Sequence, residues 1–147
     1  MFSRVLSNRY LILGLRLVLG GLFIWASLYK ISHPAEFAEN IYNYRMLPAE
    51  LVNLMAIVMP WLELICGTLI ILGPMIRGSA LLVSLMLGIF IIALSGAIAR
   101  GLDITCGCFG GGGRPVALET LLEDIPMLIA AVIIVVLGRP SPATGRW

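Results

Sequence analysis

Residues 51–72 read LVNLMAIVMPWLELICGTLIIL, and this run decides the fold. About 20 predominantly apolar residues are enough for a helix to cross the hydrocarbon core of a bilayer. Three further apolar runs occupy residues 10–29, 78–99 and 118–138. The chain is 60% hydrophobic and 12% charged, whereas soluble domains have about 25% charged residues. The sequence therefore predicts an all-α integral membrane protein, a four-helix bundle that forms one transmembrane domain over residues 1–147.

The charges of the loops indicate how the helices are oriented, because Lys and Arg resist translocation. One set of segments carries Arg4, Arg9, Arg77, Arg139 and Arg146, and the opposite, longer loops carry Lys30, Arg45, Arg100 and Arg114 among acidic residues. We therefore expect a multi-pass protein of the bacterial inner membrane with both termini in the cytoplasm. The loops over residues 30–50 and 100–117 then face the periplasm.

Two other expectations follow from the charged residues and the first apolar run. The first run is longer than the apolar region of a signal peptide, so we expect it to be kept as a helix. The formal net charge of +2 gives no reason to expect a nucleic-acid partner, because the arginines are scattered among loops.

The first outward loop has the pattern of a short amphipathic helix. Pro34 suits a first helical turn, and Phe37, Ile41 and Tyr44 recur at helical spacing. Two interpretations stay open for its aromatic residues. Tyr44, with Tyr42 and Met46, forms part of a lid over the bundle mouth, or these side chains anchor the loop at the membrane interface.

The small and polar residues of the long helices should face inward, as they do in membrane helix bundles. The spacing selects one stripe on each of three helices: Arg16, Gly20, Phe23, Ser27 and Lys30; Asn53, Ala56, Pro60, Glu63 and Gly67; and Ser84, Gly88, Ile91, Ser95 and Ala99. A carboxylate near the bilayer centre costs about 2.5–3.5 kcal/mol, so Glu63 needs a partner. We expect it to pair with Arg16, either to fix helix register or as a proton or ligand site.

The stretch ITCGCFGGGGRP, residues 104–115, places two of the three cysteines one residue apart. Metal ligation is disfavoured because a structural zinc site needs four Cys or His ligands. A structural disulfide in so small a ring constrains little of the unfolded chain. A redox role for Cys106 and Cys108 is favoured, because a tight disulfide ring is easily reduced and the neighbouring glycines leave room for a partner.

These residues resemble the MauE branch of the DoxX-like membrane proteins over nearly the whole chain. The resemblance depends on Lys30, Pro34, Phe37, Tyr44, Leu47, Pro48, PWLEL at 60–64, Gly67, RGLDITCGCFG at 100–110, and Asp124. It implies a redox-associated four-helix membrane protein. It also implies a part in forming disulfides in a periplasmic enzyme subunit, alongside a thioredoxin-like protein.

The residues and the resemblance together predict a membrane thiol–disulfide oxidoreductase. Cys106 and Cys108 are the expected catalytic pair, exchanging electrons with a periplasmic thioredoxin-fold protein. A quinone between the helices is the expected electron acceptor, and no metal is expected. The expected cofactor-binding residues are Glu63, Trp61, Tyr44, Arg16 and Lys30.

The alternative is a non-enzymatic membrane anchor or assembly subunit for a periplasmic redox enzyme, as in the maturation of methylamine dehydrogenase. A small-molecule carrier is disfavoured because the sequence shows no internal repeat.

Overall fold

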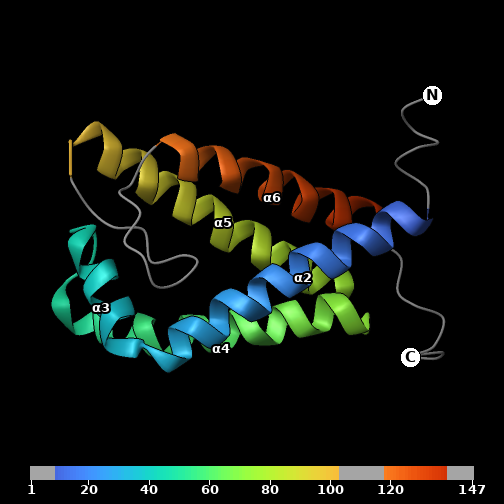
Figure 1. Ribbon diagram of the computed structural model, residues 1–147, viewed down its shortest axis with the longest axis horizontal. Coiled ribbons are helices and arrows are strands. Elements are labelled where there is room, and N and C mark those ends of the chain that lie inside the picture. The colour runs from blue at the N-terminus through green and yellow to red at the C-terminus, as the bar shows by residue number, and fades with distance from the viewer. Residues whose placement is uncertain (1–8, 103–117, 139–147) are drawn as a thin grey trace.

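The computed structural model describes residues 9–102 and 118–138, and the elements within these ranges are all helices. The described residues form the long helices α2 (Arg9–Ser32), α4 (Ala49–Leu72), α5 (Ile76–Ala99) and α6 (Leu118–Leu137) and the short helix α3 (Pro34–Asn43), which are labelled in Figure 1. The all-α expectation is confirmed for this part of the chain. The long helices begin and end within three residues of the predicted apolar runs. The short helix expected in the first loop is α3.

Three of the helices are long and apolar enough to cross a membrane. α2, α4 and α5 each have 24 residues, with mean hydropathies of 2.1, 2.1 and 2.6 over their most apolar windows. At 1.5 Å per residue such a helix is ~36 Å long, which exceeds the ~30 Å of hydrocarbon. α6 has 20 residues and carries Glu119, Glu123 and Asp124 in its first two turns. The chain is therefore a multi-pass helical membrane protein, with three of its four expected spans supported by length and composition.

The connection between α4 and α5 is short enough to make them antiparallel neighbours. Gly73 ends α4 with φ of +93°, and its N–H donates to the carbonyl oxygen of Leu69 at 2.9 Å. This left-handed conformation is open to glycine at little cost and is a common helix C-terminal cap. Only residues 73–75 then separate the two helices.

The backbones of α2 and α4 approach each other closely at two glycines. A Cβ atom on Gly20 would lie 2.8 Å from the carbonyl oxygen of Gly67, and one on Gly67 would lie 2.9 Å from that of Gly20. Small residues let the backbones of membrane helices approach in this way. The two helices run in opposite directions (Figure 1), so this contact fixes which residues of α2 lie opposite which residues of α4.

The inward stripes predicted for α2 and α4 are largely confirmed, whereas the one predicted for α5 is wrong. Gly20, Phe23, Ser27 and Lys30 of α2 are buried, as is the α4 stripe apart from the exposed Asn53. On α5, Ser95 and Ala99 are exposed, and the buried residues are Ile76, Ser79, Ala80, Val83, Met86, Leu87, Leu94 and Ala97. Ser84 and Ser95 donate to carbonyl oxygens one turn back in their own helix. A serine satisfied in this way needs no neighbouring helix.

The core lies where the four long helices converge. Its buried residues are Leu19, Phe23, Cys66, Ile70, Ile76, Ala80, Val83, Leu87, Ala131 and Ile134. In Figure 1 the α2–α4 pair and the α5–α6 pair meet toward the α4–α5 turn and separate toward the end where α3 lies. A second, smaller cluster of Tyr44, Leu94 and Ala97 lies at that separated end.

At the converged end, two arginines donate hydrogen bonds to backbone carbonyl oxygens at the C-terminal ends of neighbouring helices. Arg16 donates from Nε to the carbonyl oxygen of Ile70 and from Nη2 to that of Ile71, both at 2.9 Å. Arg77 donates from Nε to the carbonyl oxygen of Gly138 at 2.9 Å. The last carbonyls of a helix lack intrahelical partners and carry partial negative charge. The arginines therefore stabilise the ends of α4 and α6.

The glycine contact predicts a strong difference between two adjacent positions. Gly20→Leu should force α2 away from α4 and destabilise the protein by about 1–3 kcal/mol or more, as overpacked sites do. Gly21→Leu is the matched control, because Gly21 is exposed and a Cβ there has no neighbour within 4 Å. Thermal unfolding in detergent should separate the two variants, and equal stability would contradict the assigned helix contact.

Candidate functional site

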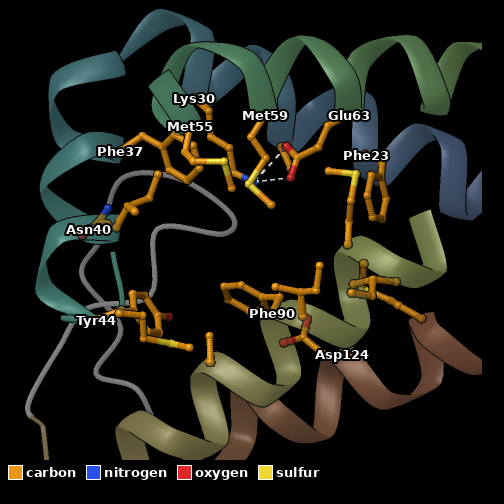
Figure 2. A pocket seen from close by; sticks show the side chains of 18 of the residues that line it. Phe23, Lys30, Phe37, Asn40, Tyr44, Met55, Met59, Glu63, Phe90 and Asp124 are labelled. Carbon is orange, nitrogen blue, oxygen red and sulfur yellow. Dashed lines mark hydrogen bonds and ion pairs between the residues drawn. The ribbon is translucent and has the colours of Figure 1, made fainter. Parts of the chain in front are cut away.

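A cavity of about 270 Å³ lies between the separated ends of the helix pairs. All five helices contribute to its walls, which are mostly apolar and rich in methionine and phenylalanine: Phe23, Phe37, Met46, Met55, Met59, Met86, Phe90 and Met127. Figure 2 shows Lys30 and Glu63 on the α2–α4 side, Phe90 and Asp124 on the α5–α6 side, and Asn40 and Tyr44 at the α3 end. The cavity is thus a hydrophobic space with a few polar groups on its walls, the usual character of a small-molecule site.

Lys30 and Glu63 form a buried ion pair on the cavity wall. Lys30 Nζ donates to Oε1 of Glu63 at 2.7 Å and to Oε2 at 2.8 Å, and the two residues are only 7% and 6% exposed. Lys30 Nζ also lies 5.0 Å from the centre of the Phe37 ring, within cation–π range. The pair therefore neutralises both charges where water is largely excluded.

The expected partnership of Glu63 with Arg16 is wrong, and side-chain direction explains why. Side chains of a helix lean toward its N-terminus. With Gly20 opposite Gly67, Lys30 and Glu63 are offset by ~9 Å along the antiparallel helices, and their side chains lean toward one another. Arg16 leans away from Glu63, toward the last turn of α4.

Tyr44 presents its hydroxyl group at the α3 end of the cavity without a hydrogen-bond partner among the described residues. The residue is 8% exposed, and its ring contacts Phe90 edge-on at 6.2 Å between centroids. Burial, and secondarily the charge of Asp124, raises the pKa of Tyr44 to about 12. The hydroxyl therefore keeps its proton at neutral pH.

The backbone around Tyr44 is fixed by a left-handed residue and by a hydrogen bond from Arg100. Arg45 adopts φ of +50°, a left-handed conformation uncommon for a residue with a side chain. Arg100, after the end of α5, donates from Nη2 to the carbonyl oxygen of Tyr44 at 3.0 Å. These two features fix the direction of the loop, with the Tyr44 ring inward and Tyr42 59% exposed. They favour the lid interpretation for Tyr44.

Asp124 was missed as a site residue by the sequence analysis. It is 2% exposed, lines the cavity, and its Oδ2 has no hydrogen-bond partner among the described residues. The available signal was its spacing, because Asp124, Met127, Ala131 and Ile134 follow one inward face of α6 at helical intervals. A carboxyl group near the N-terminal end of this inward face is expected to point into the bundle.

The structure brings together only some of the expected site residues. Lys30, Tyr44 and Glu63 share the cavity. Trp61 is 53% exposed and is not part of the cavity wall, and Arg16 binds the end of α4 far from it. Cys106 and Cys108 lie outside the described residues.

Because Lys30 and Glu63 neutralise each other, the effects of substituting them on the free energy of unfolding should not be additive. Lys30→Met or Glu63→Gln should each destabilise the protein by about 3–5 kcal/mol, because an unpaired charge stays buried, whereas Lys30→Met with Glu63→Met should cost much less than the sum. Glu36→Gln is the control, since Glu36 accepts a hydrogen bond from Tyr29 at an exposed position. Unfolding free energies in detergent test this, and single variants as stable as the control would contradict it.

Comparison with known sequences gives one consistent family. The family described as Methylamine utilisation protein MauE matches residues 8–137. The protein named Methylamine utilization protein MauE from Paracoccus denitrificans is 31% identical over 129 residues, covering 86% of this chain and 69% of the relative. Its namesake from Methylorubrum extorquens is 32% identical over 125 residues, covering 83% and 67%.

A third relative of the same name, from Paracoccus versutus, is 32% identical over 111 residues, which cover 75% of this chain and 60% of the relative. No solved structure matches the chain. The match to the family extends over most of the chain, including all five helices described above. The chain therefore belongs to the MauE family.

Proposed function

We propose that this protein is a membrane thiol–disulfide oxidoreductase whose redox pair is Cys106 and Cys108. A thiolate of a periplasmic thioredoxin-fold protein attacks the Cys106–Cys108 disulfide and forms a mixed disulfide, which the second thiol of that protein resolves. The partner leaves with a disulfide, and Cys106 and Cys108 become thiols. A membrane quinone would then take up the two electrons and two protons, which restores the disulfide.

The observation that carries this proposal is the position of the cavity beside the described residues on either side of the cysteine segment. Leu102 and Leu121 flank the segment 103–117, and both pack against the cluster of Tyr44, Leu94 and Ala97. The chain therefore leaves and rejoins the described structure beside the cavity. An apolar site for an electron acceptor therefore lies next to both ends of the segment that carries the two cysteines.

The cavity also fits the class of acceptor proposed. Its walls are apolar, and the Tyr44 hydroxyl, which has no hydrogen-bond partner among the described residues, can donate to an oxygen of a quinone ring, whereas Asp124 Oδ2 can accept from a hydroxyl of the reduced ring. Lys30 and Glu63 add a neutral polar pair on the opposite wall (Figure 2). Trp61 and Arg16 are not part of this proposal, because neither lines the cavity.

The proposed location is the bacterial inner membrane, with the cysteine pair facing the periplasm and the termini in the cytoplasm. Arg16 and Arg77 bind helix carbonyls at the converged end, and an excess of arginine near helix ends favours the cytoplasmic side. The cavity and the flanks of the cysteine segment lie at the other end. The names of the relatives suggest that the client belongs to methylamine utilisation.

Cysteine substitutions test the redox function. In nanodiscs, Cys106→Ser and Cys108→Ser should each abolish oxidation of a reduced thioredoxin-fold domain, measured as loss of free thiols, because a single cysteine cannot complete the exchange. Cys66→Ser is the matched control: Cys66 is a buried free thiol in the helix core, and its loss should leave turnover within about twofold.

The same variants separate the proposal from a non-enzymatic role. A single-cysteine variant should accumulate a mixed disulfide with the periplasmic partner, visible on non-reducing gels. If the double serine variant still supports maturation of the client enzyme in cells, the protein acts as an anchor or assembly subunit and the oxidoreductase proposal fails.

A further inference from the structure

The cavity wall contains a buried carboxyl group, that of Asp124, whose Oδ2 has no hydrogen-bond partner among the described residues. Among the described residues of its wall, the charged ones are Lys30, Glu63 and Asp124. Lys30 donates to both carboxylate oxygens of Glu63, so these two neutralise each other. Within residues 9–102 and 118–138, Asp124 Oδ2 has no hydrogen-bond partner, although the residue is 2% exposed. A buried acceptor of this kind is costly unless a donor reaches it.

A second polar atom without a partner lies in the same cavity. Tyr44 is 8% exposed, and its hydroxyl has no hydrogen-bond partner in the part of the chain that the structure describes. This hydroxyl keeps its proton and offers both a donor and an acceptor. The two groups come from different elements, α6 and the loop after α3, and both reach the same space (Figure 2).

The other residues that line the cavity indicate the chemical character of the rest of the ligand. Leu22, Met55 and Ile89 line the cavity and are also at least one-third exposed, on helices apolar enough to cross the membrane. The cavity is therefore accessible from the lipid phase. Methionine and phenylalanine side chains adapt to and pack against flat rings. A lipid-soluble ring with oxygen substituents fits these walls. If one of the substituents is a hydroxyl group, it can donate a hydrogen bond to Asp124.

We propose that Asp124 and Tyr44 form the head-group site for a quinol, the reduced and hydroxyl-bearing form of the acceptor. One quinol hydroxyl donates to Asp124 Oδ2, and the Tyr44 hydroxyl bonds to a ring oxygen. A quinone has carbonyl oxygens in place of the hydroxyls and cannot donate to Asp124. The site therefore binds the product of the electron transfer more tightly than the substrate, which favours electron transfer from the dithiol to a quinone that is bound there. This inference rests on the proposed function for its direction of electron flow.

Equilibrium binding tests this preference directly. Decylubiquinol and decylubiquinone are titrated anaerobically, by calorimetry, into the protein in nanodiscs. The lipid is phosphatidylcholine, because its head group has no hydroxyl that could donate to Asp124. The wild-type protein should bind the quinol about tenfold or more tightly than the quinone, the effect of one hydrogen bond to a charged group. Asp124→Asn should remove most of the preference, because an amide serves both ring forms.

Matched controls lie next to each residue. Glu123→Gln removes the adjacent carboxylate on the exposed face of α6 and should keep the preference. Tyr44→Phe should weaken binding of both forms about threefold or more, whereas Tyr42→Phe should not, because Tyr42 is 59% exposed. Equal binding of the two forms by the wild-type protein, or an unchanged preference in Asp124→Asn, would overturn the inference.

The double serine variant separates this inference from the proposed function. Cys106→Ser with Cys108→Ser should bind the quinol as the wild-type protein does, since neither cysteine belongs to the head-group site. If the wild-type protein binds the quinol selectively but does not oxidise thiols, the site is supported and the proposed function fails. Absence of binding alongside intact thiol oxidation would do the opposite.

Discussion

The antiparallel register of α2 and α4 is the constraint on which the other features of the structure depend. It is set by backbone contact between Gly20 and Gly67, where no side chain separates the helices. From that contact, helix geometry places Arg16 at the last turn of α4 and brings Lys30 toward Glu63. A slip of one residue would rotate these side chains by about 100° around their axes and break both interactions. The glycines therefore determine where the buried charges meet.

The two ends of the molecule differ because their buried polar groups are treated differently. At the converged end, arginines bind carbonyls that helix geometry leaves free, and ten buried apolar residues fill the core. At the separated end the helix pairs leave a cavity, and two buried polar atoms stay without partners among the described residues. Packed interiors contain few such spaces, and each unsatisfied group reduces stability. Local costs of this kind are expected where a protein binds something.

The helices could be predicted from the sequence, and their packing and the candidate site only in part. Four apolar runs sufficed for the helices because their length and composition admit few alternatives. The expected pairing of Glu63 with Arg16 was wrong because the spacing of residues along a helix does not show toward which end each side chain leans. The α5 face was misplaced because its serines bond within their own helix. Trp61 looked functional from its neighbours PWLEL, but a large aromatic on a membrane helix can equally face lipid. The redox pair, Cys106 and Cys108, stays a prediction.

The link between the cysteine segment and the cavity depends on Tyr44. Its hydroxyl faces the cavity, whereas its carbonyl oxygen accepts a hydrogen bond from Arg100, three residues before the cysteine segment begins. Leu102 packs against the same residue cluster. In the proposed mechanism, one residue therefore contacts both the electron acceptor and the chain that carries the thiols. Because Arg45 holds the adjacent backbone in a left-handed conformation, Tyr44 cannot turn away from the cavity without rearranging its hydrogen bond with Arg100 and the cluster against which Leu102 packs.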